Sequence, residues 1–277
     1  MQAKAVIDHL VNWLRDYCEA SKTTGFVIGV SGGVDSAVTS ALCALTGKNT
    51  LVLEMPIYQA ASQVNRAQDH IAWLQSKFQN VSAERVELTA VFDQFMTAMP
   101  KVESGELLNL SLANTRARIR MTTLYYFAGL HKLLVAGTGN KVEDFGVGFF
   151  TKYGDGGVDL SPIADLNKTD IYEIGRELGI IDSIMKAAPT DGLWGDDRTD
   201  QDQIGASYPE LEWAMSYLNS IPQKAGQIPD SKFNVDDFPE LTERQKQILK
   251  IYWQRNRANR HKMEPIPVCL IPRDLRF

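Results

Sequence analysis

Phe26-Val27-Ile28-Gly29-Val30-Ser31-Gly32-Gly33-Val34-Asp35-Ser36 joins an apolar, β-branched segment to a Ser-Gly-Gly turn, and an apolar helical segment, 37–45, follows. Glycines let a backbone turn tightly and bring its N–H groups close to a ligand. Those N–H groups and the start of a helix together attract an anion. The stretch therefore predicts a strand, a phosphate-binding loop and a helix, in that order.

The predicted loop differs from the common nucleotide-binding loop, because no Gly-Lys-Ser/Thr follows it. Phosphate would then be held by backbone N–H groups and by the hydroxyls of Ser31 and Ser36. Asp35 repels phosphate directly, so we interpret it as a ligand of a bridging Mg²⁺. A plain glycine turn is the alternative, which a lone Gly-Gly would favour and the full Ser-Gly-Gly-Val-Asp-Ser pattern does not.

The composition of the 277-residue chain excludes some classes of function. A net charge of -5 argues against a protein that binds nucleic acid in bulk. No apolar run approaches the length of a membrane span, so we expect neither nucleic acid nor a membrane as a partner. Cys18, Cys43 and Cys269 lack metal-ligand spacing, which predicts buried free thiols in a reducing cytoplasm.

Strand-like runs alternate with helical patterns along the first half of the chain. We expect strands at 26–30, 51–55, 85–88 and 133–136, with crossover helices at 66–77 and 113–130. Such alternation predicts an α/β fold: a doubly wound, mostly parallel, Rossmann-like sheet with helices on both faces.

The second half of the chain shows less regular patterns. The least structured stretches are 144–159 and 187–205, and 221–240 is interpreted as an excursion before a final helix at 242–262. Since no boundary for a second domain is evident, residues 1–277 are expected to form a single domain.

Two glycine-containing turns are predicted to meet at one edge of the sheet. Ligands of open parallel sheets bind beyond the carboxyl ends of the strands, near the switch point. Ser31–Ser36 follows one strand and Gly137–Glu143 follows another. Glu143 then becomes a second oxygen ligand for Mg²⁺, opposite Asp35. Taken alone, the second segment favours a helix cap made by Thr138 or Asn140, and only its position at this edge makes a ligand-binding role equally supported.

Further candidate residues lie on a helix and in a mixed loop. Arg116 and Arg120 share a helix face while Arg118 points nearly opposite, so we expect some to pair with carboxylates within the protein and at least one to reach an anion. Segment 149–159 mixes aromatics, glycines, a lysine and acids, which favours a ligand-binding loop over a tight turn.

Charges near helix ends supply the last candidates. Lys168 stands at a helix start, where a cation opposes the helix dipole, so a phosphate contact is favoured over a side chain pointing into water. Segment 187–205 suits either an acidic loop or a lid. The basic residues at 255–262 are typical of favourable charge at a helix C-terminus. The functional alternative is a contact with a phosphate or carboxylate of a dinucleotide.

Together these motifs resemble the ammonia-dependent NAD⁺ synthetases of the N-type ATP pyrophosphatase superfamily, whose fold is of the adenine nucleotide alpha-hydrolase type. The motifs follow the family order from Gly29 to Lys262: Ser-Gly-Gly-Val-Asp-Ser, Asn-Thr-Arg-Ala-Arg-Ile-Arg-Met, Gly-Thr-Gly-Asn-Lys-Val-Glu, Thr-Lys-Tyr-Gly-Asp-Gly-Gly-Val-Asp-Leu-Ser-Pro, Leu-Asn-Lys-Thr-Asp and Pro-Thr. The first motif is shared by the whole superfamily, and the ordered set is specific.

The resemblance implies a set of site residues. ATP would be held by Gly29, Val30, Ser31, Gly32, Gly33, Val34, Asp35, Ser36, Thr138, Lys168 and Thr190. Mg²⁺ would be held by Asp35 and Glu143, and deamido-NAD⁺ by Arg118, Lys152, Asp159, His261 and Lys262. Asp155, near the ammonia, and Lys168 would be catalytic. Many relatives read Pro-Thr/Ser-Ala-Asp/Glu-Leu where this chain has Pro-Thr-Asp-Gly-Leu, so only Thr190 is carried over there.

The resemblance also implies a reaction: ATP-dependent amidation of deamido-NAD⁺ to NAD⁺ with ammonia, through an acyl-adenylate, releasing AMP and pyrophosphate. It implies a homodimer with deamido-NAD⁺ close to the subunit interface. Glutamine hydrolysis needs a nucleophilic cysteine with an activating base. Cys18 and Cys43 lie on apolar helical stripes, so ammonia is expected from solution or from a partner.

Two other functions stay open on the sequence. One is another ATP pyrophosphatase, such as a tRNA-thiolating or GMP-forming synthetase; a tRNA enzyme should show a basic face and often paired cysteines, and this chain has neither. The other is a non-catalytic binder of adenine nucleotides, which would not need Glu143, Lys152 and Lys168 around a second substrate.

Overall fold

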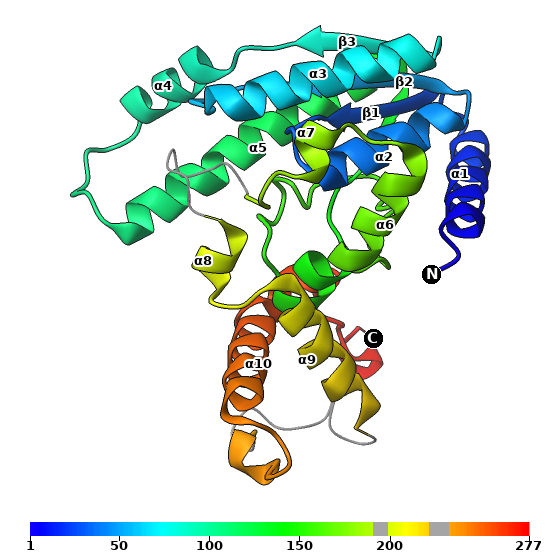
Figure 1. Cartoon of the computed structure of the whole chain (residues 1–277). Helices are drawn as coiled ribbons and strands as arrows, with labels where there is room; N and C mark the ends of the chain where they lie inside the picture. Colours follow the sequence, from blue (N-terminus) through cyan, green and yellow to red (C-terminus); the bar gives the residue numbers. More distant parts are fainter. Residues whose placement is uncertain (191–198, 222–232, 277) are drawn as a thin grey trace.

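A computed structural model of the chain describes residues 1–190, 199–221 and 233–276. Its centre is a four-stranded sheet in the order β3-β2-β1-β4, in which every pairing is parallel (Figure 1). The strands are β1 (Gly25–Gly29), β2 (Asn49–Glu54), β3 (Val81–Arg85) and β4 (Leu133–Val135). Since β2 and β4 flank β1, the direction of winding reverses between β1 and β4, which makes this the switch point of the sheet.

Helices cover both faces of the sheet. The described part of the chain contains the helices α1 (Ala3–Ala20), α2 (Val34–Leu45), α3 (Ala61–Lys77), α4 (Thr89–Ala98), α5 (Glu106–His131), α6 (Lys168–Leu178), α7 (Asp182–Met185), α8 (Asp200–Ile204), α9 (Tyr208–Ser220) and α10 (Glu243–Met263). Phe26 and Ile28 of β1 pack in the cluster that contains α1, α2 and α6, whereas Val27 packs with α4 and α5. Burial on both faces is typical of parallel strands and confirms the predicted doubly wound α/β class.

One predicted strand was placed wrongly along the chain. The third strand was expected at 85–88, but β3 is Val81–Arg85. Its register explains the difference, because Glu54, the last residue of β2, pairs with Arg85 and leaves no partner strand beyond that point. The predicted helix at 113–130 is also longer in the structure, since α5 begins at Glu106.

A smaller hydrophobic cluster lies apart from the sheet. It joins α9, α10 and the π-helical turn η1 (Val142–Val147), which lie below the sheet in Figure 1. Segment 144–159 was expected to be among the least structured, yet η1 occupies its beginning. π-helical turns are frequent at functional sites. The short 3₁₀ helices η3 (Val235–Asp237) and η4 (Arg273–Leu275) complete the described elements, and the expectation of a single domain remains a prediction.

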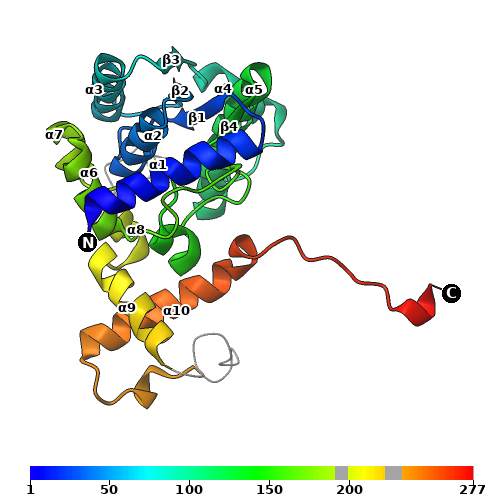
Figure 2. The same ribbon diagram turned by 90° about the vertical axis from the view of Figure 1, so that its right-hand side faces the viewer.

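The C-terminal segment projects away from the rest of the molecule (Figure 2). Cys269 lies there and is exposed, so the expectation of burial was wrong for it, while Cys18 and Cys43 are buried free thiols. Among the described residues, none of the helices combines the length and the apolar character that a membrane span requires.

His70 is a buried histidine in the main core and gives a pH-dependent stability. Its Nε2 lies 2.9 Å from the Ser40 hydroxyl, and desolvation lowers its pKa to about 4. In the unfolded chain the pKa of this histidine is near 6.5. Between pH 6.5 and pH 4 the unfolded state therefore binds more protons than the folded state, so the free energy of unfolding falls as pH falls. From His70 alone we expect a loss of about 2 kcal/mol between pH 7 and pH 5. Urea unfolding at both pH values checks this, with His70→Gln as the test variant and His131→Gln, at an exposed site, as its control. If the free energy of unfolding of His70→Gln depends on pH as steeply as that of the wild type, the expectation is contradicted.

Candidate active site

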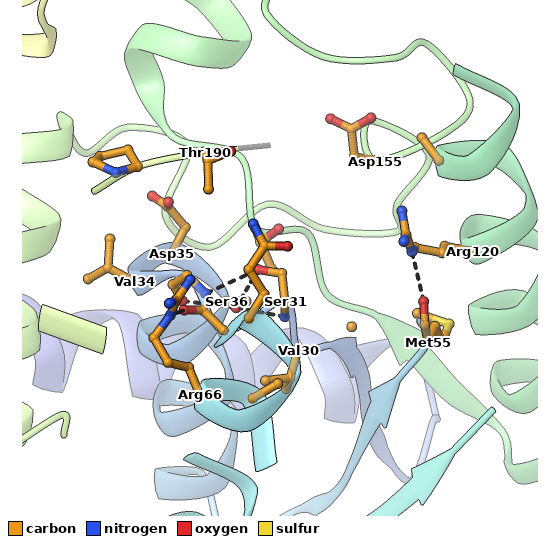
Figure 3. A pocket seen from close by; sticks show the side chains of 18 of the residues that line it. Val30, Ser31, Val34, Asp35, Ser36, Met55, Arg66, Arg120, Asp155 and Thr190 are labelled. Carbon is orange, nitrogen blue, oxygen red and sulfur yellow. Dashed lines mark hydrogen bonds between the residues drawn. The ribbon is translucent and has the colours of Figure 1, made fainter. Parts of the chain in front are cut away.

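A cavity opens beyond the carboxyl ends of β1 and β4. Its lining includes the whole of segment 29–36, part of which is labelled in Figure 3. Thr138, Glu143 and Lys168 line it as well. The structure thus brings the two turns to one cavity, as their positions after neighbouring strands predicted. Thr190 and Asp155, two further predicted site residues, also line it.

The loop after β1 is shaped by its own serines. Ser31 N–H donates to Ser36 Oγ at 3.2 Å, and the Ser36 hydroxyl donates to Gly33 O at 3.0 Å. Gly32 has a φ of +80°, a conformation that favours glycine, and its carbonyl accepts from Arg66 Nε at 3.2 Å. Helix α2 then begins with Gly33 at its N-cap and no side chain capping it, so its first N–H groups stay available to an anion.

Lys168 bridges the two acids that were predicted to bind Mg²⁺. Its Nζ lies 2.5 Å from Asp35 Oδ2 and 2.9 Å from Glu143 Oε1, although the three residues come from distant segments. Asn140 ties the acids together further, because its amide donates to Asp35 at 3.2 Å and accepts from the Glu143 N–H at 3.1 Å. The cation that opposes the dipole of α6 is therefore balanced by two carboxylates.

The electrostatics of Lys168 keep it charged. Burial alone would lower the pKa of its ammonium, since the residue is only 4% exposed. The carboxylates of Asp35 and Glu143 more than offset that effect and raise the pKa above its ordinary value. The described partners of the Lys168 ammonium are carboxylates, and its predicted phosphate contact remains a prediction.

Tyr208 and Asp200 belong to the same cluster and were not predicted. The Tyr208 hydroxyl contacts Glu143 Oε1 and lies 2.7 Å from Asp200 Oδ2. Burial, followed by the nearby carboxylates, raises the pKa of Tyr208 far above its ordinary value, so the hydroxyl keeps its proton. Ser207 and Glu210 form a capping box that could have predicted the start of α9 from sequence.

The arginines of α5 play different parts. Arg120 lines the cavity and donates to Met55 O at 2.9 Å and to Gln59 Oε1 at 2.8 Å (Figure 3). Burial lowers its pKa to about 10, which leaves it charged at neutral pH. Arg118 donates to the Lys152 carbonyl at 3.3 Å. The partners of Arg118 and Arg120 are carbonyl and amide oxygens, so the carboxylate pairing expected for some of the three arginines remains a prediction.

Asp155 stands on the cavity wall at the loop that follows η1. Its Oδ1 accepts from the Thr151 N–H at 2.9 Å, which fixes the loop around it. The surrounding walls desolvate the carboxyl and raise its pKa, even though the side chain is open to the cavity. Asp155 thus presents a carboxyl group to the cavity.

The five residues predicted to contact deamido-NAD⁺ do not line this cavity. Four of them form one cluster, since Arg118 contacts Lys152, Lys152 Nζ donates to His261 O at 2.6 Å, and Lys262 follows His261. Lys262 Nζ also donates to Gly148 O and Phe150 O, at 2.5 and 2.7 Å. Asp159 lies apart, where it accepts from Val135 N–H and Tyr125. We refer to Arg118, Lys152, His261 and Lys262 as the basic cluster.

The fold and this cavity define a class of protein. A parallel sheet with a glycine-containing loop and a lysine–carboxylate cluster at its switch point is an α/β fold of the adenine nucleotide alpha-hydrolase-like type. Residues 6–264 match the family model described as NAD synthase. The chain therefore belongs to the NAD synthase family.

Curated relatives and solved structures agree with this family. The NH(3)-dependent NAD(+) synthetase of Archaeoglobus fulgidus is 34% identical over 99% of this chain and 100% of its own length. The protein of the same name from Carboxydothermus hydrogenoformans is 37% identical over 74% of this chain and 82% of its own. The structure of NMN synthetase from Francisella tularensis superposes with a TM-score of 0.79, at 28% identity and 99% coverage of both chains.

Proposed function

We propose that this enzyme amidates deamido-NAD⁺ to NAD⁺, with ATP and ammonia as co-substrates. The observation that carries the proposal is the bridge from Lys168 to Asp35 and Glu143, which lines one cavity together with loop 29–36. The relatives named NH(3)-dependent NAD(+) synthetase support it.

The chemistry explains why such a cluster is needed. A nicotinate carboxylate is a poor acyl donor, because oxide is a poor leaving group. In the proposed reaction its oxygen attacks the α-phosphorus of ATP, the bond to the β-phosphate oxygen breaks, and an acyl-adenylate and pyrophosphate form. Ammonia then attacks the carbonyl carbon and AMP leaves. The loop amides and Lys168 would stabilise the charge that develops on pyrophosphate.

The acids at the cavity suit Mg²⁺. Mg²⁺ is usually bound by one or two carboxylates together with substrate phosphates, rather than by a complete cage of protein ligands. Asp35 and Glu143 supply two carboxylates beside the loop, and in the described part of the chain no group of three or more candidate ligands occurs. We propose that they hold Mg²⁺, which when bound neutralises phosphate charge.

Asp155 would serve the second half of the reaction. A carboxylate on the cavity wall attracts ammonium and can accept its proton as ammonia is released. We expect Asp155→Asn to lower kcat/KM for ammonium about 100-fold. ATP–pyrophosphate exchange with deamido-NAD⁺ should persist, since adenylation does not need this group. Asp165→Asn, at an exposed ion pair, is the control; wild-type ammonium kinetics in Asp155→Asn would remove the role.

A mononucleotide substrate is the second candidate. The Francisella protein is titled an NMN synthetase and matches nearly the whole of both chains. Nicotinate mononucleotide carries the same reacting carboxylate but lacks the adenylate half that a dinucleotide would extend towards the basic cluster. Comparing kcat/KM for the two substrates decides between them.

One assay tests the proposed function directly. Purified protein is supplied with ATP, Mg²⁺, ammonium and deamido-NAD⁺, and AMP, pyrophosphate and NAD⁺ are measured. Each reactant is omitted in turn. NAD⁺ formation that requires all of them is the expected result; ATP binding without release of pyrophosphate would instead indicate a non-catalytic nucleotide binder.

We also propose that the enzyme works as a homodimer in the cytoplasm. The buried free thiols Cys18 and Cys43 suit a reducing compartment. The C-terminal segment projects from the molecule (Figure 2). Its apolar side chains support association, because Ile266, Val268 and Leu270 are 67%, 75% and 81% exposed. Light scattering should give twice the mass of one chain, and a monomer at assay concentrations would contradict the proposal.

A further inference from the structure

Helix α9 presents one face to the lysine–carboxylate cluster. Tyr208 and Glu212 stand four residues apart, so they lie on the same side of the helix. Glu212 accepts from the Thr169 N–H at 3.0 Å and from its hydroxyl at 2.7 Å. Thr169 directly follows Lys168 at the start of α6. The first two turns of α9 therefore hold the segment that carries the bridging lysine.

Tyr208 contacts both members of the ion pair between Lys168 and Glu143. Its ring centroid lies 4.7 Å from Lys168 Nζ, close enough for a cation–π contact. Its hydroxyl contacts Glu143 at Oε1, the same oxygen that accepts from Lys168. Two contacts that converge on one oxygen, from the ammonium and from the phenol hydroxyl, restrict the rotation of the Glu143 carboxylate.

The position of Tyr208 is itself fixed. Its hydroxyl lies 2.7 Å from Asp200 Oδ2, and Tyr208 and Asp200 are 9% and 4% exposed. The capping box of Ser207 and Glu210 fixes the start of α9, and Glu210 accepts from Arg244 of α10 at 2.8 and 3.0 Å. The phenol is thus held from both sides, and its hydroxyl lies between the carboxylates of Glu143 and Asp200.

We propose that Tyr208 is a positioning residue, which orients the Glu143 carboxylate and the Lys168 ammonium for the nucleotide and its divalent cation. The inference rests on the proposed function and adds a residue to it. Partners that orient a metal-binding carboxylate typically change metal affinity or activity 10- to 100-fold when they are removed. A side chain that only filled space would act through its ring, whereas a positioning role acts through the hydroxyl.

Tyr208→Phe separates these two roles, because it keeps the ring and removes the hydroxyl. We expect the Mg²⁺ concentration for half-maximal AMP release to rise about 10- to 50-fold. The affinity for Mn²⁺ in the presence of α,β-methylene-ATP, measured by electron paramagnetic resonance, should fall by a similar factor. The KM for the nicotinate substrate should change less than threefold.

The same helix offers a matched control. The Tyr217 hydroxyl contacts Glu240, away from the cavity, so Tyr217→Phe makes the identical chemical change on α9. We expect wild-type Mg²⁺ dependence and Mn²⁺ affinity in this variant. Thermal unfolding of both variants, without nucleotide, shows that each remains folded at the assay temperature.

Two outcomes overturn the inference: Mn²⁺ affinity in Tyr208→Phe equal to that of the wild type, or losses no greater than those of Tyr217→Phe. The failure of the proposed function looks different. In that case the wild type itself forms no amidated product, while the Mn²⁺ measurement still reports on the positioning of Glu143.

Discussion

Lys168→Met is expected to lower kcat by about 10²–10³-fold, the usual cost of removing one group that stabilises transition-state charge. Lys168 is the only cation that contacts both Asp35 and Glu143 among the described residues. Methionine preserves the apolar stem of the side chain but removes the ammonium, which leaves the two carboxylates without their shared cation. The proposed adenylation step would then lack the ammonium beside the departing pyrophosphate.

Release of pyrophosphate at saturating ATP and Mg²⁺ measures this loss. Lys141→Met is the matched control, because Lys141 pairs with Asp165 at 2.8 Å on the surface and such exposed pairs contribute little. We expect that control to retain most of the activity. If Lys168→Met keeps a kcat within threefold of the wild type, Lys168 has no catalytic part and its bridge only holds two acids together.

The anomaly of Lys168 shows how far sequence reasoning reaches. A cation at a helix start breaks a local rule, and that rule can be checked without a structure. The two acids could be assigned to one edge of the sheet, because each follows a strand and parallel strands end at the same rim. The contact of both acids with the lysine itself could not be predicted, because Asp35, Glu143 and Lys168 are far apart in the sequence and meet only in the folded chain.

Tyr208 is a site residue that sequence reasoning did not find. The capping box at Ser207 and Glu210 is a local signal for the start of α9. The contact of its first residue with Glu143 depends on how α9 packs against η1 and α10, through the smaller hydrophobic cluster. Local patterns specify elements, whereas the packing between elements decides which polar side chains meet.

The basic cluster shows a similar limit. The sequence resemblance grouped Asp159 with Arg118, Lys152, His261 and Lys262, but the contacts of Asp159 are with Val135 and Tyr125. Its carboxylate accepts a backbone N–H at the end of β4, so it also supports the edge of the sheet. A motif can therefore contain a residue whose visible contacts are those of the scaffold.

Gly32→Ala is expected to have the second large effect, on ATP binding. Gly32 has a φ of +80°, and an added Cβ would lie 2.6 Å from Gln63 O. That neighbour is backbone of α3, so either the helix or the loop must move. Each hydrogen bond from a loop N–H to a charged phosphate contributes about 1.5–3 kcal/mol, and losing one lowers affinity about 10- to 100-fold.

Gly47→Ala is the control that separates the effect of the Cβ collision with α3 from the effect of backbone strain. Gly47 has a φ of +74°, and a Cβ there meets no atom within 4 Å. It lies in the turn between α2 and β2, so both variants carry the left-handed strain of about 1–2 kcal/mol, but only Gly32→Ala displaces the loop. Calorimetry should show wild-type ATP affinity in Gly47→Ala and a loss in Gly32→Ala. Equal ATP affinity in the two variants would mean that the loop amides do not hold the phosphates, because the variants differ in the collision with α3 and share the strain.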